Sequence, residues 1–172
     1  MPVLTALLLC ALFSFTGAAL AATDGTRGET SGGNAAINAQ VPSLVLISGL
    51  DDVDLGVWDG QSAMAGADPN CVWSTTGGYN ITGIGSGTNG AFTITNGNDE
   101  LTYTATWEDS SNKKAKKLKV NKALTGRLTD ADTQDCNGTT NATIAIDINK
   151  GRLNSANAGL YTGTLTLIVA VE

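Results

Sequence analysis

Apolar and polar residues alternate along much of this chain, and the alternation predicts β-strands. In the clearest run, 101–107, apolar residues are separated by threonines. A second run, 160–171, has apolar residues at odd positions: Tyr161, Leu165, Leu167, Val169 and Val171. Because successive side chains of a strand point to opposite faces of a sheet, each run predicts a strand with one buried face.

Turns rich in glycine and asparagine divide the rest of the chain into further short strands. Apolar or alternating segments occur at 35–47, 71–73, 79–84, 92–95, 117–121 and 142–148. Asn96-Gly97 is a strong hairpin signal, and helical periodicity is confined to a short stretch at 150–156. Short strands at this density, roughly seven to nine in about 150 residues, predict an all-β antiparallel sandwich over 35–172.

The first residues have the pattern of a secretory signal peptide. Residues 3–21 are apolar or small, apart from a few hydroxyl residues, and end in a small-x-small cleavage site, Ala-Leu-Ala at 19–21. No Lys or Arg precedes the run, which is atypical, but the alternative of a membrane anchor fits less well because the run is barely long enough. We predict a signal peptide over 1–21 and a flexible leader, rich in Gly, Thr and Ser, over 22–34.

Two cysteines, Cys71 and Cys136, follow the predicted cleavage site. A secreted chain with two cysteines most simply forms one disulfide. Neither cysteine belongs to a C-x-x-C pair, and the chain contains no histidine that would complete a zinc site. The sequence therefore predicts a structural disulfide and neither a metal nor a cofactor.

The amino-acid composition argues against several classes of enzyme and against a nucleic-acid partner. The chain has 172 residues, 10 Lys+Arg, 16 Asp+Glu and no His, for a formal net charge of −6. Without histidine there is no Ser-His-Asp triad, and no pair of acids lies in a glycosidase motif. A net negative charge argues against a nucleic-acid partner. We predict a protein that is not an enzyme and has no small-molecule substrate.

Two features allow a second interpretation. A lysine run at 113–122 fits either an anionic partner (a polysaccharide, lipid headgroups or nucleic acid) or an edge strand guarded against unwanted pairing. We favour the guarded edge because no aromatic residue interleaves with the lysines. Trp58 fits either a sugar platform or a core position. Together they define an alternative function, a self-contained secreted module that binds carbohydrate or matrix.

The end of the chain resembles a known family. AGLYTGTLTLIVAVE at 158–172 is similar to the last strand of secreted bacterial pilins in the spore coat protein U group, which includes the archaic chaperone–usher pilins. The matching positions are Ala158, Gly159, Tyr161, Thr164 and Thr166. A cysteine before an apolar segment, at 71–73, and an L-x-Y strand, at 101–103, add softer similarity. Family members often carry a cysteine early in the first strand, and this chain does not.

The resemblance implies a fold, an assembly mechanism and partners. The fold is an immunoglobulin-like sandwich that lacks one strand and so exposes core residues and unpaired backbone. A periplasmic chaperone fills the groove first, and the amino-terminal extension of the next subunit then replaces it, so that subunits join head to tail in a surface fibre. The implied partners are identical or related subunits, the periplasmic chaperone and an outer-membrane usher.

The main hypothesis is therefore a secreted pilus-type subunit that polymerises by donor-strand exchange, in the periplasm and then at the cell surface. Residues 35–41 are the candidate donor strand, with Ile37, Ala39 and Val41 as the inserted side chains. The same residues fit equally well the start of the chain's own first strand, because the apolar pattern continues at Val45 and Ile47. The expected border of the groove is the last strand, with Tyr161, Leu165, Leu167 and Val169.

Overall fold

A computed structural model describes residues 22–109 and 114–172 of the chain. It divides into two units, Met1–Val41 and Pro42–Glu172. The predicted signal peptide, 1–21, lies outside the described residues. In the described part of the first unit, the backbones of Thr23 and Asn34 pair through two 3.0 Å hydrogen bonds, and every side chain is exposed.

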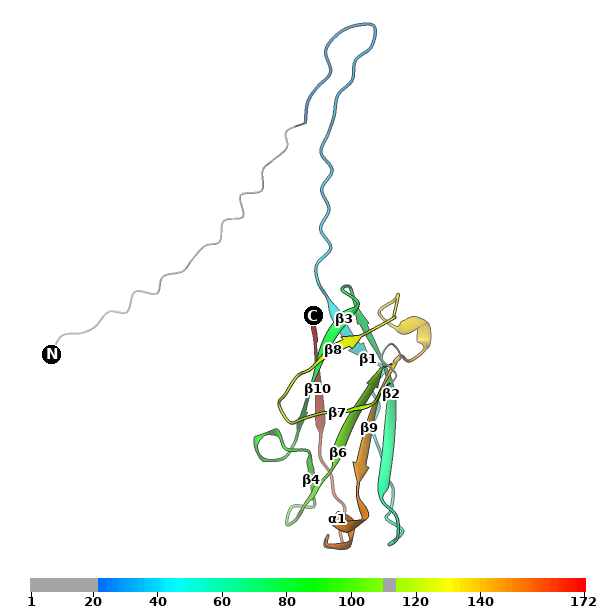
Figure 1. The fold of residues 1–172 in the computed structure, drawn as a ribbon, viewed down its shortest axis with the longest axis vertical. Helices are drawn as coiled ribbons and strands as arrows, with labels where there is room; N and C mark the ends of the chain where they lie inside the picture. Colours follow the sequence, from blue (N-terminus) through cyan, green and yellow to red (C-terminus); the bar gives the residue numbers. More distant parts are fainter. Residues whose placement is uncertain (1–21, 110–113) are drawn as a thin grey trace, which may run out of the picture. The chain divides into compact units, whose positions relative to one another are not determined.

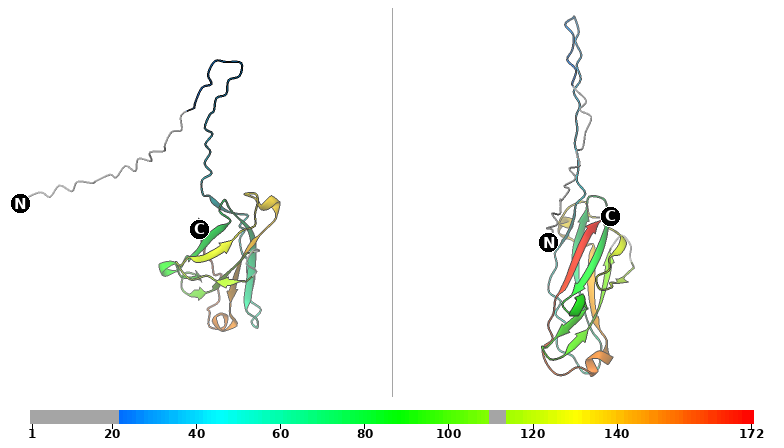
Figure 2. Two further views of the ribbon diagram at one scale, coloured as in Figure 1. Left: turned by 45° about the horizontal axis from the view of Figure 1, so that its top comes forward. Right: turned by 90° about the vertical axis from the view of Figure 1, so that its left-hand side faces the viewer.

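The second unit is an all-β sandwich, as predicted (Figure 1). One sheet has the order β1 (Val45–Ser48), β2 (Met64–Ser74), β9 (Ala142–Ile148), β6 (Thr104–Asp109) and β7 (Lys116–Lys117). The other has the order β10 (Leu165–Val171), β3 (Gly78–Gly85) and β8 (Leu124–Leu128), and Figure 2 shows β10 beside β3. A small hairpin joins β4 (Thr93–Thr95) to β5 (Glu100–Thr102). All of these strand pairs are antiparallel.

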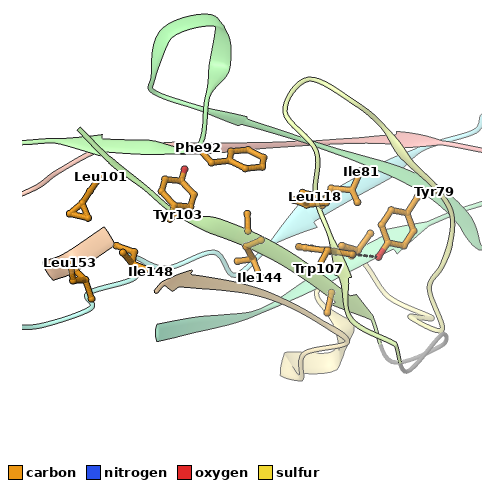
Figure 3. Close-up of a cluster of buried hydrophobic side chains, with 13 residues drawn as sticks. Tyr79, Ile81, Phe92, Leu101, Tyr103, Trp107, Leu118, Ile144, Ile148 and Leu153 are labelled. Carbon is orange, nitrogen blue, oxygen red and sulfur yellow. Dashed lines mark hydrogen bonds between the residues drawn. The ribbon is translucent and has the colours of Figure 1, made fainter. Parts of the chain in front are cut away.

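The predicted alternation produces the core. In β6 the buried residues Ala105 and Trp107 alternate with threonines that are only half-buried. Their face of the sheet packs against Tyr79 and Ile81 of β3, and Figure 3 shows Trp107, Tyr79 and Ile81 in the core cluster. The strand β6 therefore forms where a period of two places apolar residues on one face.

The predicted disulfide is present. Cys71 in β2 bonds to Cys136, which begins the 3₁₀ turn Cys136–Gly138, with the two Cα atoms 6.0 Å apart. The bond links residues 65 positions apart in the sequence. In the chain-entropy view, a loop of this length stabilises the folded state by about 4 kcal/mol.

A buried ion pair lies inside the sandwich. Arg127 Nε of β8 donates to Asp109 Oδ2 of β6 at 2.6 Å, and both side chains are almost completely buried. The Trp107 indole N–H donates to the Tyr79 hydroxyl at 3.0 Å (Figure 3). The Tyr79 hydroxyl in turn lies 3.4 Å from Asp109 Oδ2. Burial, more than the neighbouring charge, raises the pKa of Tyr79 above its ordinary value. The acid at position 109 therefore has a structural partner.

Helical structure is limited to short pieces within the described ranges. They are the 3₁₀ turns Thr88–Gly90 and Cys136–Gly138 and the helix α1 (Lys150–Asn154), which forms where the sequence shows its short helical stretch. The Asn149 side chain caps α1 by accepting from the Arg152 backbone N–H at 3.1 Å. Among residues 22–109 and 114–172, no helix is long and apolar enough to cross a lipid bilayer.

Candidate functional site

The last strand, β10, has one free edge. It pairs along its whole length with β3, from Leu165 opposite Gly85 to Val171 opposite Tyr79. No strand in the described parts of the chain forms a hydrogen-bonded ladder with its other edge, although β1 lies close to β10 without pairing with it. A free edge presents backbone N–H and C=O groups to whatever lies beside it.

The chain between β1 and β2 forms the opposite wall. We call residues 50–58 the flanking segment; its backbone forms no strand. Val53 and Leu55 pack against Gly66 of β2, where a Cβ atom would lie only 2.7 and 2.8 Å from their methyl groups. The Asp51 backbone N–H also donates to Asp68 Oδ2 at 3.2 Å. The flanking segment is thus held against β2 by side chains instead of by a hydrogen-bonded ladder.

An apolar groove of about 1200 Å³ separates these two walls. Its sides are the flanking segment and residues 157–167, which end in the first half of β10. Its floor includes Tyr103, which lies between β5 and β6, and Ile144, Ile146 and Ile148 of β9. Figure 3 shows Tyr103, Ile144 and Ile148 within the core cluster. The hydrophobic core of the sandwich is therefore open along this side.

The inward side chains of β10 are incompletely buried, as expected beside an open groove. Its inward residues Leu165, Leu167 and Val169 pack against the core but are only half-buried. The inward residues of the adjacent strand, Tyr79 and Ile81, have no exposed surface at all. A strand whose apolar face is covered only in part is expected where the next strand of a sandwich is missing.

A polar cluster fixes the wall that precedes β10. Asp99 Oδ2 accepts from the Asn157 backbone N–H at 3.2 Å and lies 3.0 Å from the Tyr161 hydroxyl. These hydrogen bonds, that from the Asn157 backbone first, hold the pKa of Asp99 below its ordinary value. The backbones of Thr95 and Thr162 pair nearby through two 2.9 Å bonds. Residues 157–162 are thereby tied to the β4–β5 hairpin.

The structure separates the two parts of the segment 35–47. Val45 and Ile47 lie in β1, which pairs with β2 and packs against the core. Ile37, Ala39 and Val41 lie in the first unit, outside any strand, and Ile37 and Val41 are 93% and 80% exposed. The chain's own first strand therefore begins at Val45, and the donor role of 35–41 stays a prediction.

The other sequence-predicted residues fall in two different places. Tyr161, Leu165 and Leu167 line the groove, whereas Val169 continues β10 beyond its lining. Trp58 also belongs to the groove wall, half-buried, with its indole N–H donating to the Ser62 carbonyl at 2.8 Å. The described lysines of 113–122 are not part of this groove. Trp58 and the lysines thus do not form one site.

Sequence reasoning missed two residues that shape the groove. Asp99 sits in a turn of polar residues, and nothing in that turn shows that it binds a segment more than fifty residues later. Gly66 lies within a strand, where a glycine is a signal for close approach of another segment. The sequence at 60–69 predicts a loop, so this signal becomes readable only once β2 is known; it then points to the packing of Val53 and Leu55.

Comparison with known proteins supports the fold. No protein-family model and no curated protein matches this sequence. Among solved structures, a chain from one described as "Chaperone-tip adhesin complex is vital for synergistic activation of CFA/I fimbriae biogenesis" has a similar fold, with a TM-score of 0.53 and 16% identity. The similarity covers 74% of this chain and 41% of that chain. At this identity the likeness shows the fold alone: this chain has an all-β sandwich similar to one found in a fimbrial chaperone–adhesin complex.

Proposed function

We propose that this protein is a secreted structural subunit of a pilus-type fibre, and that subunits join when the groove beside β10 accepts an extended segment of another copy. The observation that carries the proposal is the coincidence of a free strand edge with an open apolar core. An added strand would satisfy the backbone groups of β10 and bury its own alternate side chains on the groove floor.

The chemistry of the groove favours a strand over a small molecule. Its floor is made of aliphatic and aromatic side chains, and a free backbone edge runs along one side. A buried Val or Ile side chain stabilises a complex by about 1.5–3 kcal/mol, so a few alternate apolar residues are enough for firm binding. Main-chain hydrogen bonds to β10 would add direction and register.

Residues 35–41 have the properties required of the donor. From Ile37 onward the segment alternates apolar and polar residues, and its apolar members include the strongly exposed Ile37 and Val41. It has seven residues, the same number as β10. In an extended conformation both would span about 23 Å. The small Ala39 separates the two larger side chains.

We propose that the donor comes from another copy. Only residues 42–44 separate the candidate donor from Val45, where β1 begins, so each subunit would carry both a donor segment and a groove that accepts one. Repeated head-to-tail donation, which does not close into a ring, then produces a fibre.

The groove also gives a reason to propose a chaperone and an usher as partners. An open core with a free strand edge is prone to aggregation before assembly. A periplasmic chaperone that fills the groove would prevent this, and an outer-membrane usher would organise the exchange of chaperone for subunit. The Cys71–Cys136 disulfide is suited to the oxidising periplasm and cell surface. We assign the protein no enzymatic activity.

The alternative of a carbohydrate- or matrix-binding module built on Trp58 and the lysines together gains no support. Trp58 is half-buried in the groove wall and engaged with Ser62, so it offers no open platform. The lysines are considered below on their own geometry.

The proposal is tested by the size distribution of the oxidised protein. We would compare residues 22–172 with a protein that starts at Leu44, by size-exclusion chromatography with light scattering. We expect heterogeneous polymers from the longer protein and monomers from the shorter one. A synthetic peptide of residues 34–43 should bind the shorter protein and raise its Tm. Monomers of equal stability in both cases, with no response to the peptide, would refute the proposal.

A further inference from the structure

Another surface lies on the side of the sandwich away from the groove. We call residues 114–122 the basic segment; it follows β6, contains β7 and continues toward β8. Its Leu118 backbone N–H donates to the Ala105 carbonyl of β6 at 2.9 Å. Its Asn121 backbone N–H donates to the Gly83 carbonyl of β3 at 3.2 Å. Because β10 occupies one edge of β3, the basic segment adjoins the other edge.

The basic segment concentrates the positive charge of an acidic protein. The chain has 10 Lys+Arg, and six of them lie within 113–122. The five lysines of the basic segment are all exposed: Lys114, Lys116, Lys117, Lys119 and Lys122. None of these five forms an ion pair with an acid in the described part of the chain, although the exposed Glu108 lies close by on β6.

The backbone holds these charges close together. Lys119 and Lys122 face each other across a tight turn, with the Lys122 N–H donating to the Lys119 carbonyl at 3.1 Å. Asn121 makes this turn possible with a positive φ of 53°. Leu118, only 6% exposed, anchors the segment in the core. Like charges placed opposite each other are destabilising, so the arrangement favours a bound anion.

Protection of a strand edge explains only some of the lysines in the basic segment. Lysines on a short edge strand discourage pairing with another chain, and β7 consists of Lys116 and Lys117. Lys119 and Lys122 lie beyond β7, in the turn that follows it. Their positive charges need another explanation.

We propose that the basic segment binds a linear anionic polysaccharide through its carboxylate or sulfate groups. Exposed lysine ammonium groups are compact charges that suit a flexible polyanion. The basic segment contains no aromatic residue for base stacking and no arginine for bidentate phosphate recognition, which disfavours nucleic acid. The surface does not involve the groove, so a single subunit is able to bind without polymerising; in a fibre, repeated copies would strengthen the binding.

Heparin is the probe for the test. At low salt we expect the wild-type protein to bind heparin despite its net charge of −6 and to elute as salt is raised. K119Q/K122Q should weaken binding at least about tenfold and lower the salt dependence by about two ions, one for each lost contact. The matched control, K150Q/R152Q, removes two exposed charges from α1 and should bind like wild type. Equal thermal unfolding curves show that the variants remain folded.

The outcomes separate the proposal from its rivals. No binding to heparin overturns it. An equal loss in both double variants also overturns it, because net charge and not the basic segment would then control binding. Affinity for a thymidine oligonucleotide equal to that for heparin of the same charge would overturn the assignment to polysaccharide. Heparin binding lost only in K119Q/K122Q, with weaker oligonucleotide binding, supports it.

Discussion

The hydrophobic core of the sandwich is covered on the side of β7 and left partly uncovered on the side of β10. On the side of β7 the chain supplies its own cover: Leu118 packs against Gly83 so closely that a Cβ there would lie 3.0 Å from its methyl group. On the side of β10 a groove of about 1200 Å³ separates the flanking segment from residues 157–167. One hydrophobic core is therefore closed on one side and open on the other.

The two sides also differ in their exposed strand edges. The edge strand β7 is two residues long and both are lysines, whereas β10 is seven residues long and carries no charge. Lys116 lies directly opposite Trp107 in the paired strand. Because opposite residues point to the same face of a sheet, Lys116 is on the face that carries the core. A charge in that place discourages strand addition. The contrast suggests that the protein directs strand pairing to β10.

The largest expected effect comes from placing a charge on the proposed donor. Ile37→Asp should abolish polymerisation, because an isolated carboxylate cannot be buried on an apolar floor. Asn38→Asp adds the same charge at the neighbouring position, whose side chain would point away from the floor, and should polymerise normally. Light scattering of both variants checks this. Equal polymerisation of the two would remove 35–41 as the donor.

Truncation of one apolar residue on each side compares the closed core with the open one. Leu118→Ala should cost about 2–5 kcal/mol of unfolding free energy, since Leu118 is fully packed. Leu167→Ala should cost clearly less in the monomer, because Leu167 is half-buried, and more in the polymer. Denaturant unfolding of each variant, as monomer and as polymer, measures the difference. Equal costs in both states for Leu167→Ala would mean that nothing covers β10 in the polymer.

Removing the lysines of β7 tests whether they guard its edge. Lys116→Thr combined with Lys117→Val should cause concentration-dependent association even when residues 35–41 are absent. The stability of the monomer should change by less than about 1 kcal/mol, as for most surface substitutions. Sedimentation at increasing concentration checks this, with K150Q/R152Q as the control for lost charge. A variant that stays monomeric would show that β7 needs no guard.

The smallest expected effect is the pH response of the Asp99 cluster. The pKa of Asp99 is held below its ordinary value by its hydrogen bonds, the Asn157 backbone first, so its carboxylate stabilises the fold above the unfolded-state pKa of about 3.9. That stabilisation is lost as pH falls through the lowered pKa. The Tm difference between wild type and Asp99→Asn should therefore shrink below about pH 4. A constant difference would contradict this role.

The sequence was sufficient for the strands with a local pattern. The threonine-separated residues of 101–107 and the apolar positions of 142–148 and 165–171 form β5, β6, β9 and β10, and the pair Cys71–Cys136 forms the predicted disulfide. In β5, β6 and β9 one face is buried, and in β10 one face is half-buried; a face that differs from the other in burial is the condition under which a period of two appears.

The groove could not be predicted from local patterns. Ile37 and Ile47 both occupy odd-numbered apolar positions of the run 35–47, each followed by a polar residue, yet Ile47 belongs to β1 and Ile37 is 93% exposed. Alternation shows that a segment is able to join a sheet and does not identify the sheet. The Asp109–Arg127 pair is likewise set by the distant pairing of Tyr79 with Arg127 in neighbouring strands. Both features depend on topology.

The most direct test of the open side is amide hydrogen exchange of β10 in the monomer and in the polymer. The central claim is that a strand from another copy pairs with the free edge of Leu165–Val171. It predicts strong new protection, in the polymer, of the β10 amides that face away from β3, with no change in β7. Unchanged exchange in β10, in a polymer that has formed, would contradict the claim.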